Sequence, residues 1–207
     1  MPSMKPEDRC FILLFGPPAV GKMAVGKDIQ RLTGIPLFHN HLAIEPVLRL
    51  FPHGSPAFRR LVDGFRDNVF REAAASDLPG LIFTFVWDFS DASDAQYVAS
   101  VCDVFADAGA RILLVELKAG LEVRLRRNRG ASRLREKPSK RDVAAAEKRL
   151  LASEESHQMN SRAPLALPWE HLLIDTTHLS SLDTARQIVS HLGLPERPDG
   201  TRTPDMK

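Results

Sequence analysis

Two glycines and a lysine near the start of the chain have the types and spacing needed to bind phosphate. Gly16 and Gly21 stand five positions apart and Lys22 follows directly, in the pattern Gly-x-x-x-x-Gly-Lys. In such a loop the backbone N–H groups point into a concave anion site, and glycine lets the backbone approach the phosphate oxygens. The lysine ammonium can bridge the β- and γ-phosphates. The spacing therefore predicts that this loop binds a nucleoside triphosphate.

The nucleotide contacts are expected along this loop and at the start of the segment after it. The expected residues are Gly16, Pro18, Ala19, Val20, Gly21, Lys22, Met23 and Ala24. Lys22 is also a catalytic candidate, because its charge can neutralise a phosphoryl group in transfer. A Gly-Pro-rich turn that only joins two elements is the alternative. The apolar run before the loop and the helical pattern after it favour the phosphate loop.

One position departs from the usual pattern. Ser or Thr normally follows the lysine and supplies a hydroxyl to Mg²⁺, whereas Met23 and Ala24 carry no hydroxyl. Either Mg²⁺ is held by phosphates, water and other oxygen ligands, or the site has lost its chemistry. The sequence leaves both alternatives open.

Transfer of a phosphoryl group to a hydroxyl of an acceptor molecule needs a group that takes the hydroxyl proton. Three side chains are candidates for this role, and each follows an apolar run. Asp88 follows the run that ends at Trp87, and could orient the hydroxyl or hold Mg²⁺ through water. His39 and His41 follow a shorter run, and a neutral imidazole can accept a proton near pH 7. The structural alternatives are a turn or cap acid for Asp88 and a hydrogen-bonding role for the histidines. The sequence does not rank the three.

Two polar residues accompany these histidines. Asn40 lies between them and could anchor an acceptor hydroxyl. Glu45 lies one helical turn beyond His41 and could orient its ring. We therefore expect Asn40 to contact the acceptor.

The segment from Arg124 to Arg141 is strongly basic. It holds nine Lys or Arg residues and one acid, Glu136, around a Gly-Ala-Ser break. This is the layout of a lid that swings over phosphates, whose oxygens guanidinium groups grip in a forked geometry. We expect Arg127 and Arg133 to stabilise the transferring group. The nucleotide contacts expected here are Arg124 and Arg129, and a solvated basic face is the alternative for each arginine.

The elements that must position these residues follow from the apolar periodicity. Strands are expected at 10–15, 37–38, 80–87, 111–117 and 171–174. Helices are expected at 19–33, 41–51, 57–76, 93–108, 121–128, 140–160 and 182–192. This alternation predicts a three-layer α/β fold around a mainly parallel five-stranded sheet. We expect one domain over 1–194 and a flexible polar tail over 195–207.

Composition limits the function further. The 207 residues are 43% hydrophobic and 26% charged, with a formal net charge of +2. Near neutrality and a basic run without interleaved aromatic residues argue against nucleic-acid binding. The first residues lack an apolar signal-like run, no stretch is apolar enough to span a membrane, and the two cysteines have no metal or redox spacing. We expect a cytoplasmic monomer or homodimer.

The run FGPPAVGKMAVGKDIQRLTGIPLFHNH resembles bacterial small P-loop kinases. This group includes shikimate kinase, gluconate kinase, nucleoside monophosphate kinases and chloramphenicol phosphotransferase. The resemblance is specific at the loop and at Leu37–His41. It departs just after the second strand, where shikimate kinase and chloramphenicol phosphotransferase carry an Asp and this chain has His39, Asn40 and His41. Shikimate itself is therefore not the expected acceptor.

The resemblance implies a P-loop NTPase fold with an arginine-rich lid at about 124–141 and acceptor-binding helices at about 41–76. Arg49 and Arg66 lie on those helices and are expected to meet the acceptor, with solvation as the alternative. Thr177, in the sequence Ile-Asp-Thr-Thr, resembles the loop that packs on the nucleotide base, with a helix-start turn as the alternative.

These observations favour transfer of the γ-phosphoryl group of ATP or GTP, with Mg²⁺, to a hydroxyl of a small molecule. The acceptor would be a sugar-like metabolite or, as in resistance kinases, an antibiotic. Two other functions stay open, an NTP-hydrolysing switch and a nucleotide sensor without chemistry. The sensor is favoured by Met23.

Overall fold

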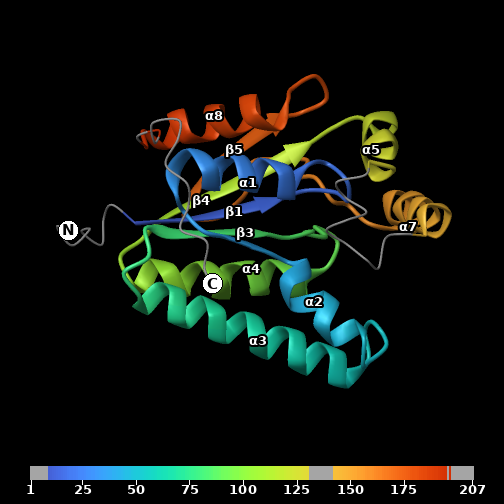
Figure 1. The fold of residues 1–207 in the computed structure, drawn as a ribbon, viewed down its shortest axis with the longest axis horizontal. Coiled ribbons are helices and arrows are strands. Elements are labelled where there is room, and N and C mark those ends of the chain that lie inside the picture. Colours follow the sequence, from blue (N-terminus) through green and yellow to red (C-terminus); the bar gives the residue numbers. More distant parts are fainter. Residues whose placement is uncertain (1–8, 131–141, 195, 197–207) are drawn as a thin grey trace.

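The computed structural model describes residues 9–130, 142–194 and 196. Its centre is a sheet of five strands in the order β2-β3-β1-β4-β5 (Figure 1). The strands are β1 (Cys10–Phe15), β2 (Leu37–His39), β3 (Gly80–Thr84), β4 (Arg111–Lys118) and β5 (Glu170–Asp175). All four pairings are parallel, so every strand ends at the same edge of the sheet.

Helices cover both faces of this sheet. α1 (Lys22–Thr33) and α8 (Ser181–Leu192) lie side by side on one face, and α3 (Pro56–Ala75) and α4 (Ala92–Asp107) lie on the other (Figure 1). The predicted three-layer α/β fold with a five-stranded sheet is confirmed, and the sheet is parallel throughout.

Three further helices gather near the carboxyl ends of the strands (Figure 1). They are α2 (His41–Leu48), α5 (Leu121–Asn128) and α7 (Val143–Ser156). Ligands of open parallel sheets bind outside the carboxyl ends of the strands, so these helices are placed to enclose a site.

The central strand shows why the sheet is sandwiched. The side chains of β1 alternate between two cores, with Phe11 and Leu13 packed toward α3 and α4, and Ile12 and Leu14 packed toward α1 and α8. All four are fully or almost fully buried. A run that is apolar at every position is typical of a strand covered on both faces.

β3 is shorter than the predicted 80–87, because it stops at Thr84. The N–H group of Phe85 still donates to Leu14 O at 2.9 Å, but β1 ends one residue later at Phe15. Without a neighbouring strand the chain leaves the sheet, although the side chains of Phe85 and Trp87 remain buried.

α7 is also shorter than the predicted 140–160, since it ends at Ser156. The next residues are held by the sheet edge instead. The N–H group of Phe89 donates to Gln158 O at 2.8 Å. Glu116 of β4, fully buried, accepts hydrogen bonds from Asn160 Nδ2 at 2.8 Å and from the amide and hydroxyl of Ser161. These bonds hold the chain after α7 in a non-helical segment.

Part of the expected organisation lies outside the described residues. The lid predicted at about 124–141 is described only as far as 130, and Arg133 lies in the omitted part. Of the tail predicted at 195–207, the structure describes only residue 196.

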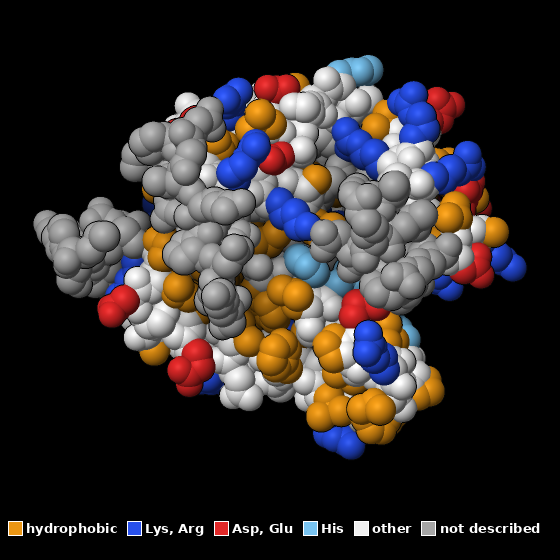
Figure 2. Space-filling view, viewed as in Figure 1, with side chains coloured by type: hydrophobic (Ala, Val, Ile, Leu, Met, Phe, Trp, Pro, Cys, Tyr) orange, Lys and Arg blue, Asp and Glu red, His pale blue; other side chains and the backbone are white. Residues whose placement is uncertain are grey.

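Hydrophobic side chains gather on the surface of α2 and α3, at the lower right of Figure 2. Leu42, Leu61 and Phe65 are 47–50% exposed, and Leu50, just beyond α2, is 76% exposed. Within the described residues, no helix is both long enough and apolar enough to cross a membrane.

Two glycines offer a matched test of this fold. Gly80 has φ +140°, and a Cβ there would lie 1.9 Å from Cys10 O, whereas a Cβ on Gly64 of α3 would meet nothing within 4 Å. Gly80→Ala should lower the free energy of unfolding by about 2 kcal/mol or more, because strand β1 must move. Gly64→Ala should raise it by ~0.5–1 kcal/mol, because alanine favours the helix. Urea unfolding measures both, and equal effects would contradict the β1–β3 contact.

Candidate functional site

The phosphate loop connects the end of β1 to the start of α1. Gly16 has φ +133°, and a Cβ there would lie 2.2 Å from the carbonyl oxygen of Leu117 in β4. Only glycine allows the chain to pass this close to β4. α1 begins at Lys22, so its free first-turn N–H groups and the positive end of its dipole face the loop.

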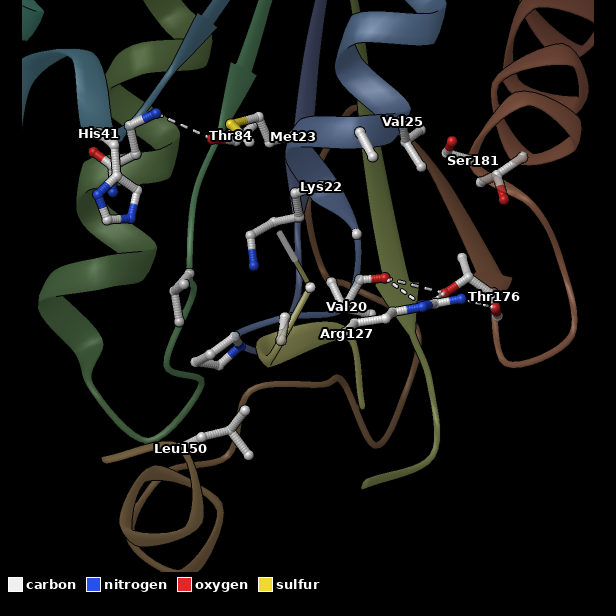
Figure 3. Close-up of a pocket in the computed structure, with 18 of the residues that line it drawn as sticks. Val20, Lys22, Met23, Val25, His41, Thr84, Arg127, Leu150, Thr176 and Ser181 are labelled. Carbon is white, nitrogen blue, oxygen red and sulfur yellow. Dashed lines mark hydrogen bonds between the residues drawn. The ribbon is translucent and has the colours of Figure 1, made fainter. Parts of the chain in front are cut away.

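Lys22 covers this loop. Its Nζ donates hydrogen bonds to the carbonyl oxygens of Gly16 and of Pro17, the latter at 2.8 Å. Figure 3 shows its side chain pointing into a cavity. A phosphate group would give the ammonium a stronger, charged acceptor than these carbonyl oxygens.

A cavity of about 640 Å³ joins the phosphate loop to the carboxyl edge of the sheet. That volume suits a ligand of drug or nucleotide size. Its lining comes from the loop and α1, the ends of β2 and β3, α5, α7, and the β5–α8 connection: Pro18–Val25, Asn40, His41, Thr84–Val86, Arg127, Gly130, Ala146, Arg149, Leu150, Ser153, Thr176, Leu179–Ser181 and Thr184. Of the expected nucleotide contacts, Pro18, Ala19, Val20, Gly21, Lys22, Met23 and Ala24 line it.

Helix α7 contributes a stripe of residues that sequence reasoning missed. Ala146, Arg149, Leu150 and Ser153 line the cavity at i, i+3, i+4 and i+7 spacing. This spacing, which places the four residues on one face of a helix, is the sequence signal that could have identified them. Within the described residues, the guanidinium of Arg149 has no hydrogen-bond partner or ion pair, so it can serve a ligand.

Two of the arginines expected to contact the nucleotide hold α5 against α7. Arg124 is buried, and its Nη2 donates to Glu154 at 2.5 Å. Arg129 forms a forked pair with Glu147 at 2.9–3.1 Å. These two ion pairs lie two helical turns apart along α7. They fix the orientation of α7 and so the direction in which its Arg149 face points.

Arg127 connects two walls of the cavity, the loop between β1 and α1 and the segment after β5 (Figure 3). It donates to Val20 O at 2.7 Å in the phosphate loop, and to the hydroxyl and carbonyl oxygens of Thr176 at 3.0 and 2.7 Å. Burial, and then the charge of Arg126, lower the pKa of this guanidinium, which still stays charged. Here Arg127 fixes the loop geometry.

Of the two threonines that follow β5, the cavity is lined by Thr176 and not by Thr177. Thr176 lines the cavity and is buried, whereas Thr177 Oγ1 accepts a hydrogen bond from Gly120 N at 3.1 Å. Both threonines belong to the same short motif, and the sequence could not decide which one faces inward.

His41 is the histidine that lines the cavity. Its Nδ1 lies 2.9 Å from Glu45 Oε1, and the two side chains are 18% and 19% exposed. Figure 3 shows the ring and Lys22 both facing the cavity. His39 ends β2, pairs in register with Thr84, and is not among the lining residues.

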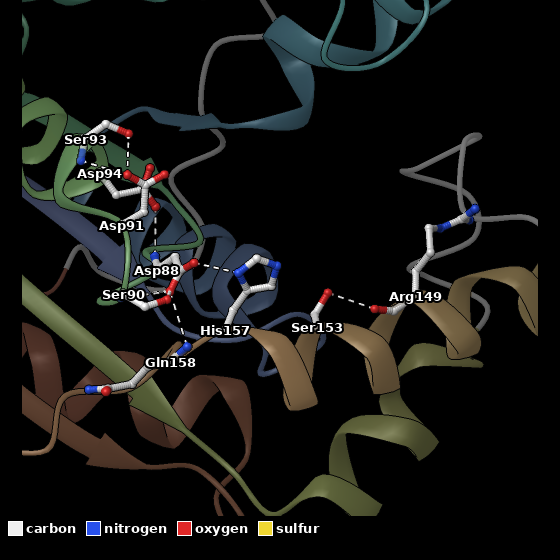
Figure 4. A network of polar contacts seen from close by, with 9 residues as sticks. All are labelled: Asp88, Ser90, Asp91, Ser93, Asp94, Arg149, Ser153, His157 and Gln158. Carbon is white, nitrogen blue, oxygen red and sulfur yellow. Dashed lines mark hydrogen bonds and ion pairs between the residues drawn. The ribbon is translucent and has the colours of Figure 1, made fainter.

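Asp88 lies outside the lining residues, and its oxygens are already used by the protein (Figure 4). Oδ1 accepts from the amide and hydroxyl of Ser90 and from Gln158 N, and Oδ2 is 2.6 Å from His157 Nδ1. Although burial raises the pKa of Asp88, the bonds from Ser90 and His157 outweigh it, and the net shift is downward. The carboxylate fixes the end of α7.

The two arginines expected at the acceptor lie differently. Arg49 is exposed at the end of α2 and does not line the cavity. Arg66 is buried on α3 and contacts the cavity wall indirectly, since its Nη2 donates to Asn40 Oδ1.

The described residues do not supply a metal site of their own. No three His, Cys, Asp or Glu side chains among them are grouped to hold a metal ion. Met23 and Ala24 have no side-chain oxygen, and Asp88 is not among the residues that line the cavity.

Comparison with known proteins gave matches among solved structures. No protein-family model matches the chain, and no curated protein matches it. A tunicamycin resistance protein from Deinococcus radiodurans is 25% identical with a TM-score of 0.50, covering 92% of this chain and 99% of its own.

A gluconokinase and an APS kinase share the fold at lower identity. A gluconokinase from Sinorhizobium meliloti 1021 is 14% identical, with a TM-score of 0.53 over 90% of this chain and 93% of its own. The APS kinase of Mycobacterium tuberculosis, solved with AMPPNP and APS, is 16% identical, with a TM-score of 0.55 over 91% and 99%. The resemblance to small P-loop kinases is therefore confirmed at the level of the fold.

Proposed function

We propose that this chain is a phosphotransferase that moves the γ-phosphoryl group of ATP or GTP to a hydroxyl of a small molecule. One observation carries the proposal. A single cavity is lined both by the loop with Lys22 and by His41 at the start of α2, whose Nδ1 lies 2.9 Å from Glu45 Oε1. A donor phosphate and an acceptor hydroxyl can therefore meet in the same enclosed space.

The nucleotide would bind with its phosphates at the start of α1. Lys22 would leave the carbonyl oxygens of the loop and contact the β- and γ-phosphates, supported by the first-turn N–H groups. Mg²⁺ would arrive as part of the nucleotide substrate. Arg149, which faces the cavity from α7, would add a second positive charge beside the transferring group.

His41 is the proposed base. With Nδ1–H donated to Glu45, the Nε2 lone pair can take the proton of the acceptor hydroxyl. The acceptor oxygen then bonds to the γ-phosphorus, the bond to the β–γ bridging oxygen breaks, and the nucleoside diphosphate leaves. Glu45 stabilises the imidazolium that forms. Asp88 is less suited, because its oxygens already accept hydrogen bonds outside the cavity.

An antibiotic is a specific candidate for the acceptor. The tunicamycin resistance protein matches 25% of aligned residues over nearly the whole length of both chains, and this supports a resistance role. A second candidate function is a nucleotide sensor, which is favoured by the missing hydroxyl at Met23.

Acceptor-dependent transfer is the direct test. Purified protein with Mg²⁺ and ATP or GTP should release nucleoside diphosphate only with certain members of a panel of sugars, nucleosides and hydroxylated antibiotics, tunicamycin included. Mass spectrometry should show a product heavier by one phosphate. Lys22→Ala should slow transfer by about 10²–10³-fold, because one preorganised charge contact is lost. Lys27→Ala, an exposed position of the same helix, is the control, and full activity in Lys22→Ala would exclude the proposal.

The choice between His41 and Asp88 has its own test. His41→Gln should lower kcat by about 10²–10³-fold, the range of general base catalysis, with nucleotide affinity unchanged. Asp88→Asn should leave kcat close to the wild-type value. If Asp88→Asn abolishes turnover and His41→Gln does not, the roles are reversed.

Asp88→Asn should instead change acid stability. The pKa of Asp88 is lower in the folded protein than in the unfolded chain, so its stabilisation is present above the unfolded value of about 4 and is lost as the pH falls. Melting temperatures measured from pH 3 to pH 7 should show a difference between wild type and Asp88→Asn at neutral pH that shrinks below about pH 4. A constant difference would disprove the pairing.

The missing hydroxyl gives a gain-of-function prediction. Met23→Thr restores an oxygen where the pattern usually has one, so nucleotide affinity with Mg²⁺ should rise about fivefold, equivalent to one hydrogen bond of ~1 kcal/mol. Without Mg²⁺ the variant and the wild type should bind nucleotide equally. Calorimetry with and without EDTA measures this, and equal affinities under both conditions would show that position 23 does not face the metal.

A further inference from the structure

The acceptor half of the cavity is lined by a small group of polar atoms with a definite hydrogen-bonding pattern. Asn40 and Thr84 lie next to His41 in this wall. They are linked, because Asn40 N donates to Thr84 Oγ1 at 3.1 Å. Figure 3 shows this bond between the start of α2 and the end of β3.

Arg66 determines which way the Asn40 amide points. Arg66 is 8% exposed, and its Nη2 donates to Asn40 Oδ1. A guanidinium has donors only, so the oxygen of the amide must face it and the NH₂ group must point the other way. Within the described residues, Asn40 Nδ2 has no hydrogen-bond partner, and it is not sealed from solvent.

Arg66 is itself held in place by its surroundings. Its Nη1 donates to Asp63 at 3.1 Å, and the guanidinium carbon lies 6.0 Å from the ring centre of Tyr97. Arg66 does not line the cavity. The residue therefore supports the wall from behind and does not reach the acceptor.

Thr84 presents a second donor beside the first. Its oxygen already accepts from Asn40 N, and no described residue accepts its hydroxyl proton. A polar group that accepts one hydrogen bond becomes a stronger donor of another. The Asn40 amide accepts from Arg66, and the Thr84 hydroxyl accepts from Asn40 N, so both become stronger donors. The wall thus offers two neutral donors side by side.

We infer that Asn40 and Thr84 form a two-donor subsite for an oxygen of the acceptor molecule, and that Arg66 is the positioning residue for it. The ligand would carry a hydrogen-bond-accepting oxygen, such as an ether, carbonyl or carboxylate oxygen, next to the hydroxyl that faces His41. A group with donors only, such as an ammonium, would meet no acceptor on the NH₂ group of Asn40. This inference rests on the proposed function and names its substrate class.

Two fragments of the same shape test the subsite directly. 2-Methoxyethanol carries an ether oxygen beside its hydroxyl, and butan-1-ol has a methylene in that place. Each is titrated into the isotope-labelled full chain, and the backbone amide signals of His41 and Thr84 are followed by NMR. The wild type should bind 2-methoxyethanol about fivefold more tightly, the value of one hydrogen bond.

The variants separate the roles. Asn40→Asp keeps an oxygen toward Arg66 but loses the NH₂ donor, so the preference should disappear while the fold is kept. Arg66→Met should reduce the preference, and Arg66→Lys should restore part of it, which a merely structural effect would not do. Arg60→Met, at an exposed arginine of the same helix, should bind as the wild type.

Three outcomes would overturn the inference: equal affinities in the wild type, a preference that survives Asn40→Asp, or no shift with either fragment. The titration requires no phosphoryl transfer. A chain that binds the fragments as expected but transfers phosphate to no compound would refute the proposed kinase and leave the subsite standing. A chain that transfers phosphate but shows no preference between the fragments would refute the subsite and leave the proposed kinase standing.

Discussion

The site depends on one close contact, between the start of the phosphate loop and β4. Gly16 passes so near Leu117 O that no side chain fits between them, which fixes where β1 ends and where α1 begins. Because the five strands are parallel, the ends of β2 and β3 reach the same edge. The loop with Lys22 and the ring of His41 therefore line one cavity, although they lie on separate elements.

Around this edge, charged residues act mainly on the protein itself. Arg127 joins the phosphate loop to Thr176, and Arg124 and Arg129 fasten α5 to α7 through two ion pairs. At the other end of α7, Asp88 and Glu116 hold the chain on the sheet. These contacts surround the cavity, and Arg149 lines it without a partner among the described residues. Such preorganisation is what electrostatic stabilisation of phosphoryl transfer requires.

The fold was largely predictable from the sequence, because apolar runs and helical periodicity are local signals. The loop between β1 and α1 was predictable because its Gly-x-x-x-x-Gly-Lys pattern lies in seven consecutive residues, and its binding of phosphate stays a prediction. The partners of individual side chains were not predictable from the sequence. Whether Arg127 meets a phosphate or Val20 O, and whether Asp88 meets an acceptor or His157, depends on residues more than sixty positions away. The cavity stripe of α7 was visible in its spacing, but spacing alone does not say what a helix face meets.

The central claim is that the loop between β1 and α1 binds the outer phosphates of a nucleotide. Calorimetric titration of the full chain with ATP, ADP and AMP, each with Mg²⁺, tests it most directly. ATP and ADP should bind at least about tenfold more tightly than AMP, because only they place a β-phosphate among the loop N–H groups and Lys22. If AMP binds as tightly as ATP, the loop does not bind the outer phosphates, and the account of the cavity fails.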